Sequence, residues 1–179
     1  MNVEEIRQQA QNENTAPKIL TKLANSEDKI TRQYVASNPN TPTDVLKQLV
    51  EEFPNEIAAN PIFDLLLLEN NESKIFLDRS IARNSRTTSD TLSVLSHNSN
   101  CIVRSAVALN FNTKPDVLSV LAKDLEPSVR HGVALNPNTP PYVLSIIAED
   151  SVYFVRRRVA YNPNTPKDIL AILVQEIKD

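Results

Sequence analysis

Residues 133–144 read VALNPNTPPYVL, and three other stretches of the chain repeat this pattern. They are VASNPNTPTDVL at 35–46, VALNFNTKPDVL at 107–118 and VAYNPNTPKDIL at 159–170. With the first Asn of each stretch as an anchor, equivalent Asn residues recur every 22 to 26 residues: Asn12, Asn38, Asn60, Asn84, Asn110, Asn136 and Asn162. Each anchor has Ala two residues before it and Leu eight residues after it. The chain is therefore an array of short tandem repeats.

The spacing of apolar residues predicts two helices in each copy. After an anchor they fall at i, i+1 and i+4, as in Val143, Leu144 and Ile147, and before it at i and i+4, as in Val129 and Val133. Both spacings form one stripe on a helix of 3.6 residues per turn. We expect helices of about 8 to 10 residues, too small to bury their apolar stripes alone. Stacked copies predict an all-α solenoid forming a single domain over residues 1–179, with about six full repeats and a partial one.

The connecting turn is predicted from its own residues. Pro39 disfavours helical backbone at Asn38, and the Asn side chain can then accept a hydrogen bond two residues on. Thr41 is a good N-cap for the second helix, with Asp44 completing a variant of the capping box. The same turn and cap roles are expected for these residues: Asn38, Thr41, Asn110, Thr113, Asn136, Thr139, Asn162 and Thr165.

The copies share the pattern VRxxVAxNPNTPxxVLxxLAxD, seen best from Val129 to Asp150. This pattern resembles the leucine-rich repeat variant family, which is similar to the armadillo and HEAT solenoids. The resemblance implies a right-handed superhelix of alternating α and 3₁₀ helices without a sheet. Some members of that family carry a Cys cluster that holds an iron-sulfur centre. The chain has only Cys101, so no such cluster, and no other cofactor or metal, is expected.

The third copy, around residues 51–80, is irregular. Phe63 replaces the recurring Thr, and an aliphatic run follows at 65–68. One interpretation is a degenerate copy whose core is filled by Phe53, Phe63, Phe76 and Leu77. The other is a kink or an exposed apolar groove at 65–68 for a partner.

Composition narrows the possible functions. The chain of 179 residues has 19 basic and 22 acidic residues and a net charge of −3, which gives no bulk attraction to nucleic acid or membrane. A single Gly excludes Gly-rich phosphate loops. No stretch is typical of a signal peptide or a membrane span, so the expected location is cytoplasmic, with no membrane partner.

Arginine recurs six residues before four anchors, at Arg32, Arg104, Arg130 and Arg156. Such a column could hold phosphates or an acidic peptide, because guanidinium groups match their oxygens. The alternative is a row of ion pairs between repeats, since acidic residues such as Asp124 and Asp150 recur after the second helices.

Two further arginines, Arg157 and Arg158, lie outside that column. Together with Arg130 and His131, one repeat earlier, they form a candidate partner-binding patch. A solvated surface is the alternative interpretation, because charged residues on helices usually face water. His97 and Cys101 lack a recognisable orienting group, and no catalytic constellation is evident.

The sequence therefore predicts a non-catalytic scaffold that binds another protein and is a monomer or a weak homo-oligomer. Nucleic-acid binding through the Arg column is the first alternative, disfavoured by the acidic balance and an expected scarcity of exposed aromatic residues. An enzyme or lyase on a HEAT-like scaffold is the second, and it would need a pocket with convergent polar groups.

Overall fold

The computed structural model describes residues 2–62 and 71–178. Within these ranges all regular structure is α-helical and no strand is present. The chain forms two compact units, residues 1–86 and 87–179. The all-α prediction is confirmed, and the predicted single repeat domain contains both units.

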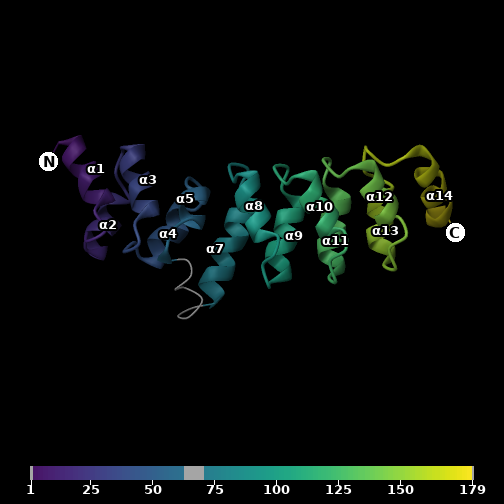
Figure 1. The fold of residues 1–179 in the computed structure, drawn as a ribbon, viewed down its shortest axis with the longest axis horizontal. Helices are drawn as coiled ribbons and strands as arrows, with labels where there is room; N and C mark the ends of the chain where they lie inside the picture. Colours follow the sequence, from purple (N-terminus) through teal and green to yellow (C-terminus); the bar gives the residue numbers. More distant parts are fainter. Residues whose placement is uncertain (1, 63–70, 179) are drawn as a thin grey trace. The chain divides into compact units, whose positions relative to one another are not determined.

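Unit 1 consists of helices that pack in the order of the repeats (Figure 1). The first helix of each copy contacts the first helix of the next, so α1 packs on α3, α3 on α5 and α5 on α7. The shorter second helices pack against these first helices. The helices are α1 (Val3–Gln11), α2 (Pro17–Leu23), α3 (Lys29–Ser37), α4 (Thr43–Leu49), α5 (Pro54–Ala58) and α7 (Asn71–Arg83).

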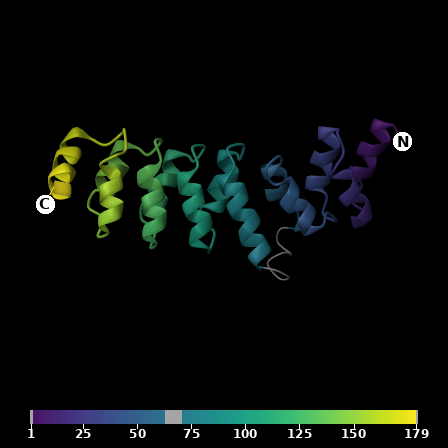
Figure 2. The ribbon, with the colours of Figure 1, turned by 180° about the vertical axis from the view of Figure 1, so that it is seen from behind.

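Unit 2 repeats the arrangement with greater regularity, and Figure 2 shows it from behind. Helix α11 lies between α9 and α13 and contacts both, while α10 and α12 pack against these first helices. The helices are α8 (Ser89–Leu95), α9 (Cys101–Leu109), α10 (Pro115–Leu121), α11 (Pro127–Leu135), α12 (Pro141–Ile147), α13 (Tyr153–Val159) and α14 (Lys167–Lys178).

The nine-residue first helices match the predicted length of about 8 to 10 residues, and the seven-residue second helices are shorter than predicted. Four first helices, α1, α3, α9 and α11, have nine residues each, and five second helices, α2, α4, α8, α10 and α12, have seven. Both kinds are α-helices, so the 3₁₀ helices that the family resemblance implies do not occur in the described ranges.

The core of each unit is built from the recurring positions. The Leu eight residues after the anchor is fully buried at Leu20, Leu46, Leu92, Leu118 and Leu144. The Ala two residues before it is fully buried at Ala10, Ala36, Ala82, Ala108 and Ala134. Helices α9 and α11 approach closely at Gly132, where an added Cβ would lie 2.9 Å from the Cβ of Ala108. Small residues therefore set the spacing between neighbouring copies.

The predicted turn is confirmed at all seven anchors. The side-chain oxygen of Asn136, for example, accepts a 2.9 Å hydrogen bond from the backbone N–H of Asn138. The same bond to the residue two positions on forms at Asn12, Asn38, Asn60, Asn84, Asn110 and Asn162. An Asx turn thus ends each first helix.

The other side of each anchor amide reaches into the preceding copy. Asn136 donates to the main-chain carbonyls of Ala108 at 2.8 Å and Asn110 at 2.9 Å. Asn38, Asn60 and Asn162 make the equivalent pair of bonds to the copies before them. Every atom of this buried amide therefore has a partner, which avoids the cost of an unsatisfied buried polar group.

The predicted N-cap role of the recurring Thr is wrong. The hydroxyl of Thr139 donates to the carbonyl of Val133 at 2.6 Å, in the last turn of the preceding helix. The same bond forms at Thr41, Thr113 and Thr165. The carbonyls in the last turn of a helix lack intrahelical donors, and the buried hydroxyl supplies one. The second helix α12 begins instead with Pro140 as N-cap and Pro141 at its first position, with no side-chain cap.

The irregular copy matches its prediction in part. Phe53 and Leu77 are buried in the core of unit 1, but Phe76 is 51% exposed, so the prediction that it fills the core is wrong. Helix α7 directs Leu77 into the core. The side chain of Phe76, one residue earlier, is rotated by about 100° around the helix axis and therefore points elsewhere. Phe63 and the aliphatic run at 65–68 lie outside the described residues.

Among the helices of residues 2–62 and 71–178, none combines the length and the apolar character needed to cross a membrane.

Candidate functional site

The recurring arginines join neighbouring repeats. Arg130 on α11 donates from Nε and Nη2 to both carboxylate oxygens of Asp150, at 2.5 and 2.9 Å. Its Nη1 donates to the carbonyls of Asp124 and Leu125, at 2.7 and 3.1 Å. Arg104 binds Asp124 and Arg32 binds Glu52 in the same bidentate way. These bonds confirm the interpretation as ion pairs between repeats for Arg32, Arg104 and Arg130.

The ion pairs change the acidity of their carboxylates. Hydrogen bonds from Arg104 lower the pKa of Asp124 against the opposing effect of burial. For Asp150 burial is the largest influence and acts to raise the pKa. The bond from Arg130, the N–H of Val152 and nearby positive charge together outweigh it, so the pKa is lowered. Both carboxylates are therefore ionised near neutral pH and neutralise the Arg column.

Three of the four residues of the predicted patch line one hollow in unit 2. His131 extends from α11, and Arg157 and Arg158 extend from α13. Phe154 and Tyr161 complete the lining of a space of about 330 Å³. Arg130 does not line this hollow and is bonded to Asp150 instead. We call these five lining residues the basic-aromatic hollow.

The repeat itself explains why these residues meet. His131 and Arg157 both lie five residues before their anchors, Asn136 and Asn162, so they occupy equivalent positions on neighbouring first helices. Because α11 packs directly on α13, equivalent positions lie side by side. The His131 and Phe154 rings meet edge to face, with centroids 5.6 Å apart.

The charge of the basic-aromatic hollow is not neutralised within the described chain. Neither Arg157 nor Arg158 has an ion pair or a hydrogen bond to a side chain in residues 2–62 and 71–178. Burial lowers the pKa of His131, and the charge of Arg158 lowers it further. The imidazole is therefore neutral near pH 7, and two positive charges remain for a ligand.

Sequence analysis missed the exposed aromatic residues. Phe154 is 50% exposed and Tyr161 is 63% exposed at the hollow. Elsewhere in unit 2, Phe111, Tyr142 and Tyr153 are also exposed. The expected scarcity of exposed aromatic residues is thus wrong. The position of Tyr161 in the repeat could have indicated its exposure. It directly precedes an anchor, and Leu109, which precedes another anchor, is also exposed.

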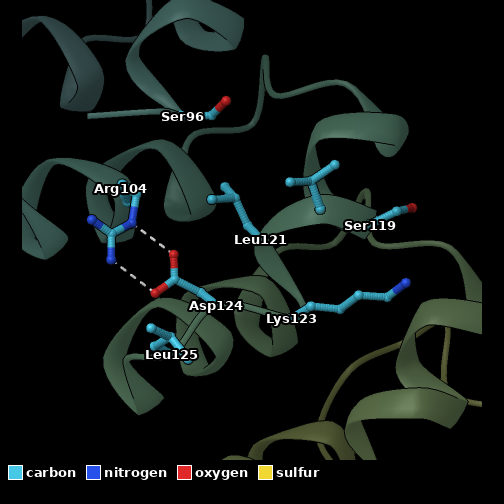
Figure 3. A pocket seen from close by; sticks show the side chains of 8 residues that line it. Ser96, Arg104, Ser119, Leu121, Lys123, Asp124 and Leu125 are labelled. Carbon is cyan, nitrogen blue, oxygen red and sulfur yellow. Dashed lines mark hydrogen bonds and ion pairs between the residues drawn. The ribbon is translucent and has the colours of Figure 1, made fainter. Parts of the chain in front are cut away.

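A second hollow of about 580 Å³ lies between repeats of unit 2 (Figure 3). Arg104 and Asp124 bind each other at one end, and the Lys123 side chain extends away from that pair. Val120 on its rim is 61% exposed and belongs to a row of exposed aliphatic residues ten positions after the anchors: Val94, Val120, Ile146 and Ile172. This hollow offers apolar surface, with its strongest polar groups already paired.

The other candidate catalytic and metal-binding residues of the described chain do not form a site. The Nδ1 atom of His97 lies 3.1 Å from both the Ser96 hydroxyl and the Ser93 carbonyl, and Cys101 is half-buried on α9. In the described part of the chain no three His, Cys, Asp or Glu side chains cluster closely enough to hold a metal ion.

A solved structure described as "a leucine-rich repeat variant with a novel repetitive protein structural motif" is similar to this chain, with a TM-score of 0.46. The two are 18% identical, and the match covers 90% of this chain and 72% of that one. No family model matches the chain, and no curated protein matches it.

Proposed function

We propose that this chain is a non-catalytic helical-repeat protein that binds another protein through the basic-aromatic hollow. One contrast supports the proposal. The polar residues that recur between copies, such as Asn136, Thr139 and Arg130, are hydrogen-bonded within and between repeats. Arg157 and Arg158 recur in no other copy of unit 2 and have no such partner in the described chain.

A binding role fits the lining better than catalysis does. His131 and Tyr161 are the groups of the lining, besides the two arginines, that could transfer a proton. The lining as described contains no Ser, Cys, Asp or Glu, so it offers neither a common nucleophile nor a carboxylate base.

Nucleic-acid binding is a second candidate, and the exposed aromatic residues of unit 2 favour it because bases stack on such rings. The net charge of −3 and the carboxylates of Asp124 and Asp150 beside the Arg column act against it. The protein-binding role is therefore the better supported. The cytoplasmic location and the monomeric or weakly self-associating state stay predictions.

Crosslinking and affinity capture from the native cells would test the proposed function. The intact protein is compared with the variant Arg157→Glu/Arg158→Glu, which reverses both unpaired charges of the hollow. The control, Lys22→Glu/Lys123→Glu, makes the same change in net charge at exposed lysines outside the hollow. We expect the partner to be lost with the first variant and retained with the control. An identical set of captured proteins from all three would contradict the proposal.

A further inference from the structure

The basic-aromatic hollow selects for a particular chemistry. Resting on the proposed function, we propose that it binds an acidic segment of a partner protein in which Asp or Glu residues flank one aromatic side chain.

The charge of the hollow requires a negative partner. Arg157 and Arg158 contribute two positive charges, and the lining contains no carboxylate. The neighbouring Arg130 is neutralised by Asp150, so it does not add to the attraction. A segment with two negative charges therefore balances the site, and guanidinium groups bind carboxylates with two parallel hydrogen bonds.

The positions of the arginines favour two separate carboxylates over one phosphate. Adjacent residues leave a helix about 100° apart and do not face each other. Arg157 is exposed and Arg158 is half-buried, as expected for neighbours on different sides of α13. Two carboxylates on an extended segment can meet these two differently exposed groups one at a time, whereas a single phosphate would have to reach both from one point.

The rings provide the second part of the specificity. Phe154 presents half of its surface to solvent, although its ring already contacts His131 at one edge. Tyr161 is 63% exposed on the same hollow. An aromatic side chain of the partner can pack against these rings, since such pairs favour edge-to-face and offset arrangements. The space of about 330 Å³ is large enough to admit a side chain of this kind.

The short extent of the basic surface argues against a nucleic-acid strand. The position equivalent to His131 and Arg157 in the preceding repeat is Ser105, which is uncharged. Arg104 and Arg130 are bound to Asp124 and Asp150. A phosphate backbone that leaves the hollow along these positions would therefore meet the uncharged Ser105 and two neutralised arginines.

Fluorescence anisotropy with the intact chain tests the proposal. The probe is a labelled peptide of about a dozen residues with one Phe between Asp and Glu residues. Three other probes are variants of this peptide. In the first Phe is replaced by Ala, in the second the acids are replaced by their amides, and in the third both the acids are amidated and Phe is replaced by phosphotyrosine. A labelled oligothymidine is the fifth probe.

We expect the acidic Phe peptide to bind most tightly of the five. The variants Arg157→Gln and Arg158→Gln each weaken it about 3- to 10-fold, and Phe154→Ala weakens it about 2- to 10-fold. Lys123→Gln, at an exposed lysine of the second hollow, leaves the affinity unchanged. Circular dichroism melts of each variant verify that it is folded.

Each other outcome overturns the proposal in a different way. Tighter binding of the phosphotyrosine peptide would show that the hollow prefers one phosphate to two carboxylates. Tightest binding of oligothymidine, with a steep salt dependence, would overturn the protein-binding function as well. If no peptide binds while capture of a partner still depends on Arg157 and Arg158, the proposed ligand is wrong and the proposed function stands.

Discussion

The side-chain amide of Asn136 donates a 2.8 Å hydrogen bond to the main-chain carbonyl of Ala108, in the preceding repeat. Its oxygen serves the turn to Asn138 at the same time. A single buried side chain thus ends its own helix and holds the helix before it. The stability of unit 2 therefore depends on Asn136. The local sequence around this residue indicates its turn but not its hydrogen bonds to the preceding repeat.

Replacing Asn136 by Asp separates these two roles. The carboxylate keeps the acceptor for the turn but loses both donors, and it places a negative charge beside two carbonyl oxygens. We expect the free energy of unfolding to fall by about 2 to 4 kcal/mol, measured by chemical denaturation at neutral pH. The control is Asn138→Asp, which removes an exposed bond to Phe111 and should cost about 1 kcal/mol or less. Equal losses in the two variants would contradict the role of Asn136.

Replacing Thr139 by Val tests the corrected role of the recurring Thr. Valine fills the same space but cannot donate to the carbonyl of Val133. We expect a loss of about 1 kcal/mol in urea denaturation, because the Val133 carbonyl loses the hydroxyl donor and keeps only the N–H of Asn136. Thr139→Ser keeps the hydroxyl and should retain most of the stability. A Val variant as stable as the wild type would show that the bond contributes nothing.

The close approach at Gly132 predicts that Ala is unfavourable there, although Ala is the better helix former by about 1 kcal/mol. The new Cβ would lie 2.9 Å from Ala108 Cβ and 3.2 Å from the Ser105 carbonyl oxygen. We expect Gly132→Ala to destabilise unit 2 by about 1 to 3 kcal/mol in thermal unfolding. Adding Ala108→Gly should recover part of that loss. Additive losses in the double variant would refute the steric cause.

The lowered pKa of Asp150 gives a pH dependence of stability. A carboxylate whose pKa is lower in the folded state stabilises the protein above its unfolded pKa, near 4, and loses this contribution as the pH falls through the folded value. Wild type should therefore be more stable than Asp150→Asn at pH 7, with the difference shrinking below about pH 4. Denaturation curves at a series of pH values measure it. A difference that is constant from pH 7 to pH 2 would contradict a role for the ionised pair.

The repeat and both helices of each copy were predictable because apolar spacing and Pro-rich turns are local signals. The Asx turn at Asn38 was predictable for the same reason. The contact between Asn38 and Ala10 was not, since it joins residues of different repeats and depends on how the copies stack. Thr41 was assigned to the wrong helix because its residue type and position suit an N-cap, while the burial that turns its hydroxyl toward Val35 is a tertiary effect.

The candidate site was predicted in part. The sequence identified His131, Arg157 and Arg158 as a local concentration of charge outside the Arg column. It did not separate Arg130 from them, because the bond to Asp150 forms only when successive repeats are packed. Phe154 was missed since an aromatic residue at a helical position is usually core, and its exposure depends on the neighbouring helix.

The Arg130 ion pair to Asp150 and the amide bonds of Asn162 to the copy before it all span about one repeat. Excising one period of 26 residues, for example 111–136, would join two equivalent sites and let the same partners form again with the next copy. A deletion of any other length would separate donors from acceptors at every crossing of the cut. A chain built in this way can gain or lose whole repeats during evolution, and the same rule applies to engineered versions.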